Sequence, residues 1–314
     1  MKGKILMAIK IAVSLASLVI VIRTVDVSII AKLLREIDAG CVVLALGIFW
    51  VAQIVSSLRC VYVAHSLGEK LELSTSVRAH FVGLWFNQVL PTSLGGDFLK
   101  IAILRKTIGL GVAIRSTILD RFSGLFLMML AIALTLPLYT DVIFPQQQGL
   151  TQGLGVLSLS FLFGTIILAW SAVRLRPHLA KYPFIQKSLE FVSDIWRFRK
   201  GAPLWRQMWT SAVVHFNGIA AYALLSVALG LHIDMLVLAL IVPLVFLAAL
   251  LPISFAGWGV REVGAIWLFG LVDVAKENAL ALSIAYGLML IVAGVPGLLL
   301  SFHESVVGAT ETRN

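Results

Sequence analysis

Charged residues are scarce in this chain. Asp, Glu, Lys and Arg make up 13% of its 314 residues, whereas a soluble domain has about 25%. Hydrophobic residues account for 60%, and the mean hydropathy is +0.98. This composition is typical of an all-α polytopic membrane protein. We therefore expect one integral membrane domain over residues 1–314 and no sizeable soluble domain.

Cysteine is scarce too, and several catalytic motifs are absent. Cys41 and Cys60 are too few and too far apart for a metal site or a disulfide framework. The sequence has no Walker A loop, no Asp-x-Asp, no His-Glu-x-x-His and no Gly-x-Ser-x-Gly. It therefore carries no recognisable ATPase, nucleotide-sugar transferase, zinc hydrolase or serine hydrolase site. We expect no catalytic residue, no metal ligand and no cofactor, and we do not expect an enzyme.

Acidic residues are fewer than basic ones, which gives a net charge of +9. In a soluble protein this excess would suggest nucleic acid, but in a membrane protein the positive-inside rule accounts for it. We thus expect no nucleic-acid partner. The basic residues predict a multi-pass protein of the cell (inner or plasma) membrane with both termini in the cytoplasm. Of the 25 Lys and Arg, 19 fall in the segments expected on that side, which are 1–4, 58–121, 173–206 and 302–314.

Six apolar runs are long enough to cross a bilayer, which takes about 20 residues per helix. The first also resembles a signal peptide, but it ends at Arg23 without a convincing cleavage site, so we interpret it as a retained span. The six expected spans are 5–22, 40–57, 122–138, 154–173, 207–230 and 279–302.

Two further apolar stretches are interrupted by helix breakers in a shared pattern. Residues 90–100 and residues 251–261, which lie 161 positions apart, match in register at Leu, Pro, Ser, Gly and a basic residue. Pro removes a backbone donor, and Gly lets the chain leave helical geometry. Coincidence in a Leu-rich chain is the alternative, but the flanking segments agree as well. We interpret the two stretches as corresponding breaks of a repeat.

We expect each break to lie inside a re-entrant hairpin, because irregular backbone at membrane depth survives only where protein surrounds it or it lines a cavity. The alternative is that each break separates two short helices that both cross the membrane completely. Each half then contains two spans, a re-entrant hairpin and a third span, so it crosses the membrane three times. This odd number of crossings inverts the second half relative to the first. The expected repeats are 1–152 and 153–314, with the first break opening to the cytoplasm and the second to the outside. The expected hairpin arms are 79–90 with 98–114, and 235–251 with 257–274.

Each break leaves a half-helix that starts inside the membrane. Its first amides lack partners, and the helix dipole adds about half a positive charge there. Lys100 and Arg261 lie close after the two breaks, so each break is a candidate seat for an anionic group such as phosphate. The candidate lipid- or anion-binding residues are Asn87, Pro91, Ser93, Gly95, Gly96, Asp97, Lys100, Asp120, Arg121, Ser254, Gly257, Gly259, Arg261 and Glu262.

The charged candidates also allow other interpretations. A charge inside the membrane costs about 2.5–3.5 kcal/mol on insertion scales, so such residues are expected to face protein and to pair. Asp120 and Arg121 equally fit a topology marker at the membrane surface. Arg261 and Glu262 fit a structural ion pair as well as a ligand or proton site. His215, inside an expected span, fits a hydrogen-bonded packing residue.

Three motifs occur in an order that is found in a known family. They resemble the transmembrane flippase-like region of lysylphosphatidylglycerol synthases, and the resemblance covers nearly the whole chain. The family usually has Arg where Lys100 stands and Gly where Ala256 stands; the first departure weakens a bidentate phosphate contact and the second stiffens the turn. The motifs are Asn87-x-x-x-Pro91-x-x-x-Gly95-Gly96-Asp97-x-x-Lys100, Asp120-Arg121-x-x-Gly124-Leu125 and Leu251-Pro252-Ile253-Ser254-x-x-Gly257-x-Gly259-Val260-Arg261-Glu262.

The resemblance implies movement of lipid between leaflets. It does not imply lipid synthesis, because the residues after the last expected span are too few for the family's soluble aminoacyl-transferase domain. We expect a flippase-like transporter of an anionic or glycosylated lipid, with a phospholipid or glycolipid substrate. The alternatives are a non-catalytic membrane partner of a separate lipid or cell-envelope biosynthesis enzyme and an integral-membrane transferase that acts on a lipid carrier.

Overall fold

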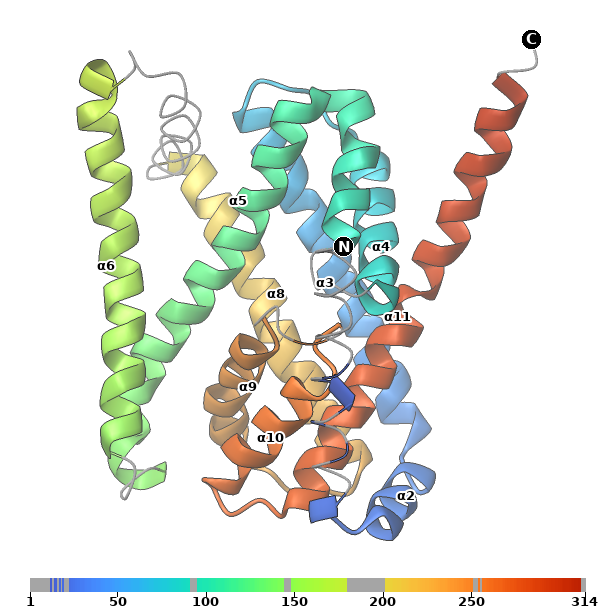
Figure 1. Ribbon diagram of the computed structural model, residues 1–314, viewed down its shortest axis with the longest axis vertical. Helices are drawn as coiled ribbons and strands as arrows, with labels where there is room; N and C mark the ends of the chain where they lie inside the picture. Colours follow the sequence, from blue (N-terminus) through green and yellow to red (C-terminus); the bar gives the residue numbers. More distant parts are fainter. Residues whose placement is uncertain are drawn as a thin grey trace. The chain divides into compact units, whose positions relative to one another are not determined.

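The protein is built from α-helices, as the sequence predicts. The computed structural model describes residues 12, 14, 15, 17, 19, 23–90, 95–143, 148–179, 201–250, 254 and 256–311, and this part of the chain contains no strand. Its helices are α2 (Val27–Arg35), α3 (Ala39–Ser66), α4 (Leu73–Val89), α5 (Gly95–Ile143), α6 (Gln148–Leu179), α8 (Gly201–Ala228), α9 (Met235–Ala249), α10 (Val260–Gly270) and α11 (Lys276–Glu311) (Figure 1).

Five helices of the described part are long and apolar enough to cross a membrane, so the chain is a multi-pass membrane protein. Four of the expected spans, 40–57, 154–173, 207–230 and 279–302, fall within or largely within α3, α6, α8 and α11. The expected span 5–22 lies mostly outside the described residues. The five membrane-length segments are Ala39–Ser66, Gly95–Pro137, Thr151–Leu168, Trp205–Ala228 and Lys276–Phe302.

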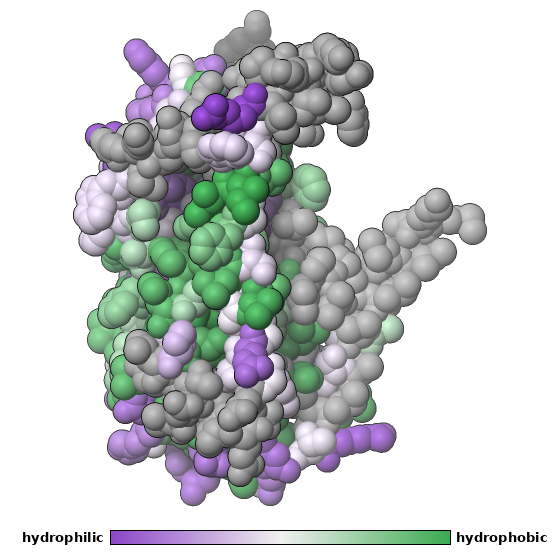
Figure 2. Space-filling view, turned by 90° about the vertical axis from the view of Figure 1, so that its left-hand side faces the viewer, coloured by the Kyte–Doolittle hydropathy of each residue, from purple (hydrophilic) through white to green (hydrophobic). Residues whose placement is uncertain are grey.

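The surface of these helices suits a lipid environment. Figure 2 shows a face on which hydrophobic residues occupy the middle while hydrophilic residues gather toward the two ends. On α6, the large side chains of Val156, Phe163, Ile167 and Leu168 are exposed. A run of exposed large apolar side chains would be unfavourable in water, whereas lipid tails solvate it.

The chain forms two compact units, each taken by itself below. The first unit consists of Met1–Ile54, Val77–Ala102 and Phe216–Asn314, and the second of Val55–Ser76 and Ile103–His215. Both units draw on residues from before and after residue 152. They are therefore not the two expected halves, and the division into repeats 1–152 and 153–314 stays a prediction.

The first unit contains two hairpins that surround the two breaks. α4 and the start of α5 form one of them, and α9 and α10 form the other. Both hairpins pack against α11: α4 does so at Gly294 and Gly297, and α10 does so at Gly287. Figure 1 shows the two hairpins beside different parts of α11, with their broken ends directed toward each other.

One boundary of the first hairpin differs from the prediction. The segments 98–114 and 122–138 were expected to be separate, but both belong to α5, which is interrupted at Gly109. Gly109 has φ 72° and ψ 158°, a conformation that glycine adopts at no steric cost. The returning arm of the hairpin therefore ends at Gly109 rather than at residue 114, and the helix that follows continues without a loop.

Candidate functional site

At the first break, a side chain from the preceding helix caps the half-helix. The backbone N–H of Gly96 donates to the Oδ1 atom of Asn87, over 2.8 Å. This bond satisfies one of the amides that a helix start leaves without a partner. Pro91 and Ser93 lie outside the described residues.

The glycines of the first break allow close contact between the two arms of the hairpin. A Cβ atom added at Gly96 would overlap the carbonyl oxygen of Gly83 in α4, and one added at Gly95 would lie 2.6 Å from the Leu90 side chain. The pattern Gly95-Gly96 is thus explained by packing, since the described structure gives neither residue a positive φ.

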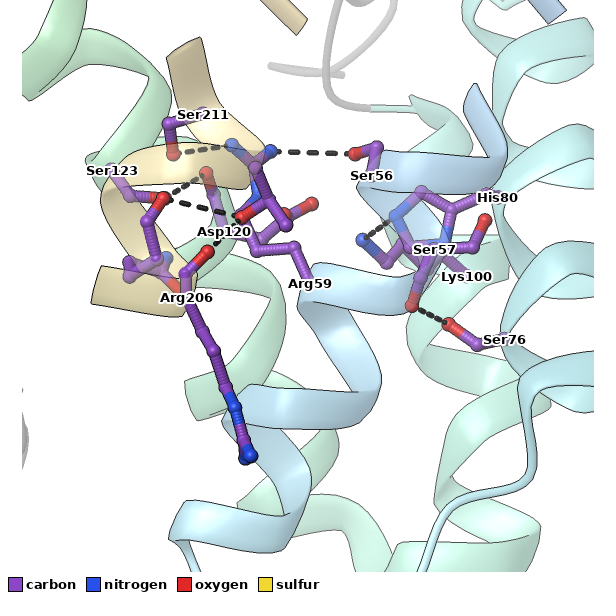
Figure 3. Close-up of polar contacts among 12 residues, drawn as sticks. Ser56, Ser57, Arg59, Ser76, His80, Lys100, Asp120, Ser123, Arg206 and Ser211 are labelled. Atoms are coloured by element: carbon purple, nitrogen blue, oxygen red, sulfur yellow. Dashed lines mark hydrogen bonds and ion pairs between the residues drawn. The ribbon is translucent and has the colours of Figure 1, made fainter. Parts of the chain in front are cut away.

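Lys100 forms the basic centre of the first hairpin. Its Nζ atom lies 2.9 Å from Nε2 of His80 in α4, and the two residues are only 4% and 8% exposed (Figure 3). A charged lysine has no acceptor, so Nε2 of His80 accepts this hydrogen bond. Asp97 lies half-buried in the first turn of α5, where the helix dipole favours an acidic group.

At the second break, the chain turns through left-handed backbone conformations. Ala256, Gly257 and Gly259 have φ values of 50°, 83° and 87°, and α10 begins directly afterwards. Pro252 lies outside the described residues. Ser254 is buried, and its hydroxyl has no hydrogen-bond partner among the residues that the structure describes.

Arg261 and Glu262 form a buried ion pair at the start of α10. The Nη2 and Nε atoms of Arg261 donate to Oε1 of Glu262 over 2.7 and 3.0 Å, while the backbone N–H of Gly259 donates to Oε2 over 2.6 Å. The Ser283 hydroxyl donates to Oε1 over 3.2 Å. Arg261 is 4% exposed and Glu262 is 0% exposed. Glu262 therefore caps the half-helix and neutralises the arginine at the same time.

Aromatic rings and a glycine hold the guanidinium of Arg261 in place. Its Cζ atom lies 4.8 Å from the ring centre of Trp258, a cation–π distance. Gly287 of α11 leaves the space that the guanidinium fills, because an added Cβ would overlap Nη2. Tyr222 and Tyr286, whose ring centres are 4.4 Å apart, are buried beside this ion pair.

Asp120 belongs to a different cluster, which lies in the second unit. Nε of Arg59 donates to Oδ1 of Asp120 over 2.6 Å, and the other two nitrogens of Arg59 donate to Ser211 and Ser56 over 2.8 and 3.3 Å (Figure 3). Both charged residues are buried, which argues against Asp120 as a surface marker. Arg121 is the next residue of α5 and is half-buried.

The structure thus places the described candidates in separate clusters at the two breaks and around Asp120, and it adds partners that sequence analysis missed. His80, Arg59 and Ser283 were not among the candidates, although each bonds to a charged candidate. The expected span 40–57 ends before Arg59. The apolar residues 60–64 that follow it are the signal that α3 continues to Ser66 and carries Arg59 inside a membrane-length helix.

α11 relates the two hairpins of the first unit to each other. It meets Arg261 at Gly287, Trp85 at Gly294 and Phe81 at Gly297. An α-helix rises 1.5 Å per residue, so these contacts fall within about 15 Å along one helix axis. That is about half the thickness of the hydrocarbon core of a bilayer.

The family model described as the lysylphosphatidylglycerol synthase TM region matches residues 7–297. No curated protein and no solved structure was found to match the chain. Among the described residues, no three His, Cys, Asp or Glu side chains are grouped so that they could hold a metal ion.

Proposed function

The chain belongs to the family of the lysylphosphatidylglycerol synthase TM region, and we propose that it is a flippase-like transporter and not an enzyme. It moves an anionic or glycosylated lipid between the two leaflets of a cell membrane. The family description supports a function connected with membrane lipid. The match covers the transmembrane region that the three sequence motifs indicate.

The observation that carries this proposal is a buried basic residue after each of two helix breaks. Lys100 follows the start of α5 by five residues, and Arg261 follows the start of α10 by one residue. Both are about 4% exposed. A buried cation is costly in a membrane and is by default a candidate for a functional site. Because each lies near a helix N-terminus, the two positions suit the phosphate of a lipid headgroup.

The arrangement of the two hairpins supports movement across the membrane. In our proposal the halves 1–152 and 153–314 are inverted repeats, with both termini in the cytoplasm. The first break then receives a headgroup from the cytoplasmic side, and the second from the outside. The shared packing of α4 and α10 on α11 supports this pairing, because one helix contacts both hairpins.

Lipid movement of this kind separates the polar and apolar parts of the substrate. The headgroup passes the buried basic residues, where a low dielectric strengthens the attraction between a cation and a phosphate. The acyl chains stay in the bilayer, beside exposed apolar side chains such as those of Val43 and Leu44 on α3. This division lets the protein lower the barrier for the headgroup without enclosing the whole lipid.

The test is a leaflet-accessibility assay on the full chain in proteoliposomes. Fluorescent NBD-labelled phosphatidylglycerol, phosphatidylethanolamine, phosphatidylcholine and a glycolipid are each incorporated, and dithionite is added to quench the outer leaflet. We expect the protein to expose inner-leaflet label for an anionic or glycosylated lipid, while protein-free vesicles keep it protected. A folded protein that is inert across the whole panel would contradict the proposal and favour a membrane partner of a separate enzyme.

A further inference from the structure

The Nε–Nη2 edge of Arg261, one of the two edges with which an arginine can bind a phosphate, is already occupied by Glu262. Both Nε and Nη2 donate to the same carboxylate oxygen, over 3.0 and 2.7 Å. These two donors form one of the planar forks with which arginine binds two phosphate oxygens at once. An external phosphate can use this fork only after Glu262 has released it.

Once released, Glu262 would be a buried carboxylate without a cation. It is 0% exposed, and its remaining hydrogen bonds come from two neutral donors, the Gly259 amide and the Ser283 hydroxyl. An isolated buried charge is strongly unfavourable, and such groups neutralise by binding a proton instead. Separation of the pair and protonation of Glu262 are thus expected to occur together.

The surrounding hydroxyl groups can accommodate that proton. The Ser283 Oγ atom lies 3.2 Å from Oε1 of Glu262, and a hydroxyl can accept as well as donate. The Tyr222 hydroxyl lies beside Ser283 and has no hydrogen-bond partner of ordinary geometry among the described residues. A protonated Glu262 can therefore donate to Ser283, while the Ser283 hydrogen turns to the Tyr222 oxygen.

Few other titratable groups of the described residues face this carboxylate. They are Arg261 on its own helix and Tyr222 of α8, while Tyr286 of α11 lies near Arg261. α9 contributes the uncharged Phe246 to the same cluster. Tyrosine ordinarily titrates far above neutral pH and arginine is effectively always protonated. Glu262 is the member of this set that can change its charge when an anion arrives.

We propose that the second break binds an anionic headgroup together with one proton, with the phosphate on Arg261 and the proton on Glu262. One O–H bond forms on Glu262, its proton comes from the solvent, and the ion pair of Arg261 passes from the carboxylate to the phosphate. This inference rests on the proposed function and deepens it, since it makes headgroup binding dependent on protons. The charge of the site is the same before and after the exchange, because the phosphate and the proton enter together.

The experiment measures proton uptake on binding to the purified full chain in detergent. Dihexanoylphosphatidylglycerol, a short-chain soluble lipid, is titrated calorimetrically in two buffers of different ionisation enthalpy, at several pH values between about 6 and about 8, with protein-free micelles as blank. Uptake of one proton per headgroup predicts that the Kd for the lipid rises about tenfold for each unit by which the pH increases. The buffer dependence of the heat should give close to one proton per bound lipid.

Variants separate this account from other sources of protons. Glu262→Gln keeps a side chain that can cap α10, and it should bind the lipid without proton uptake and with a Kd that is independent of pH. Glu69→Gln removes an exposed acid and should behave as the unmodified protein. If Glu262→Gln fails to fold, lipid binding by the unmodified protein without proton uptake would still overturn the inference.

Two results would overturn the inference. Lipid binding by the unmodified protein without proton uptake is the first, and unchanged uptake in a folded Glu262→Gln protein is the second. The leaflet-accessibility assay distinguishes the consequences. If the protein moves lipid but takes up no proton, the proposed function stands and only the proton coupling is wrong. If the protein moves none of the lipids, both proposals are wrong.

Discussion

The Nε atom of Arg59 lies 2.6 Å from a carboxylate oxygen of Asp120, across 61 positions of sequence and inside the second unit. Both side chains are at most 10% exposed. In such a place the attraction between the charges offsets the cost of removing them from water, and loss of one partner leaves the other uncompensated. The pair therefore fixes the end of α3 against the middle of α5.

We expect Arg59→Met to destabilise the protein strongly. A broken buried ion pair typically costs about 3–5 kcal/mol, whereas replacement of both partners by apolar residues is often neutral. The double variant Arg59→Met with Asp120→Leu should thus recover most of the stability. Thermal unfolding in detergent measures both. A double variant that is less stable than the single one would contradict this description of the pair.

The contact between α11 and α4 leads to a second prediction. A Cβ atom at Gly297 would overlap the Phe81 carbonyl oxygen, so Gly297→Ala should cost about 1–3 kcal/mol through forced separation of the helices. Gly47 in α3 has nothing within 4 Å of such an atom, and Gly47→Ala should be neutral or stabilising by up to about 1 kcal/mol. The two variants are compared by unfolding in the same detergent. Equal effects would refute the close contact.

The left-handed turn at the second break predicts a stabilising substitution. Ala256 has φ 50°, where a Cβ atom is disfavoured, and it stands where the family usually has glycine. Ala256→Gly should raise the stability by about 1 kcal/mol, because a left-handed conformation costs a residue with a Cβ roughly 1–2 kcal/mol. Gly257→Ala, at φ 83°, should have the opposite sign. A loss of stability in Ala256→Gly would show that the turn is not strained.

The N-terminus of α2 should depend on pH. The Ser28 hydroxyl and the Ser28 backbone N–H both donate to Oδ1 of Asp26, over 2.6 and 2.8 Å, and they hold the pKa of Asp26 below its ordinary value of 3.8. A carboxyl whose pKa is lowered by folding stabilises the folded form above its unfolded pKa. That contribution is lost as the pH falls through the folded value.

The measurement is hydrogen exchange of the first amides of α2, corrected for intrinsic rates. Protection should be constant near neutral pH and should fall below about pH 4, where the unfolded carboxyl begins to bind a proton. Asp26→Asn retains an oxygen that can cap the helix and should remove the acid-dependent loss. Persistence of that loss in Asp26→Asn would assign it to another group.

Much of the architecture could be predicted because it depends on local composition. Membrane-length apolar runs predict α3, α6, α8 and α11, and the paired Pro and Gly signals predict the position of both breaks. The interruption of α5 at Gly109 was missed, since a lone glycine beside apolar residues gives no sign of its φ. Whether two neighbouring apolar segments form one continuous helix or two helices thus depends on the backbone conformation of a single residue.

Sequence analysis named the charged candidates but not the residues that bond to them. The basic residues after the breaks and Asp120 are recognisable as charges near apolar sequence. Their partners depend on packing between helices: His80 meets Lys100 across 20 positions and Arg59 meets Asp120 across 61. Residues adjacent on a helix normally do not face each other. Arg261 and Glu262 meet because Glu262 turns back to cap the helix start at Gly259.

The central claim is that a buried cation beside the first break carries the lipid headgroup. Lys100→Met removes that charge, and a charge-assisted hydrogen bond is worth about 1.5–3 kcal/mol, equivalent to about a ten- to a hundredfold loss of affinity. Lys100→Arg keeps the charge and restores the residue that the family usually has. Lys106→Met is the matched control, because Lys106 is exposed on the same helix.

The decisive measurement is the rate of lipid exposure in the leaflet-accessibility assay, at equal reconstituted protein and with folding checked by thermal unfolding. We predict that Lys100→Arg and Lys106→Met move lipid at close to the unmodified rate, and that Lys100→Met falls by about tenfold or more. Undiminished movement by a folded Lys100→Met protein would contradict the claim and would mean that the headgroup takes a path that does not pass Lys100.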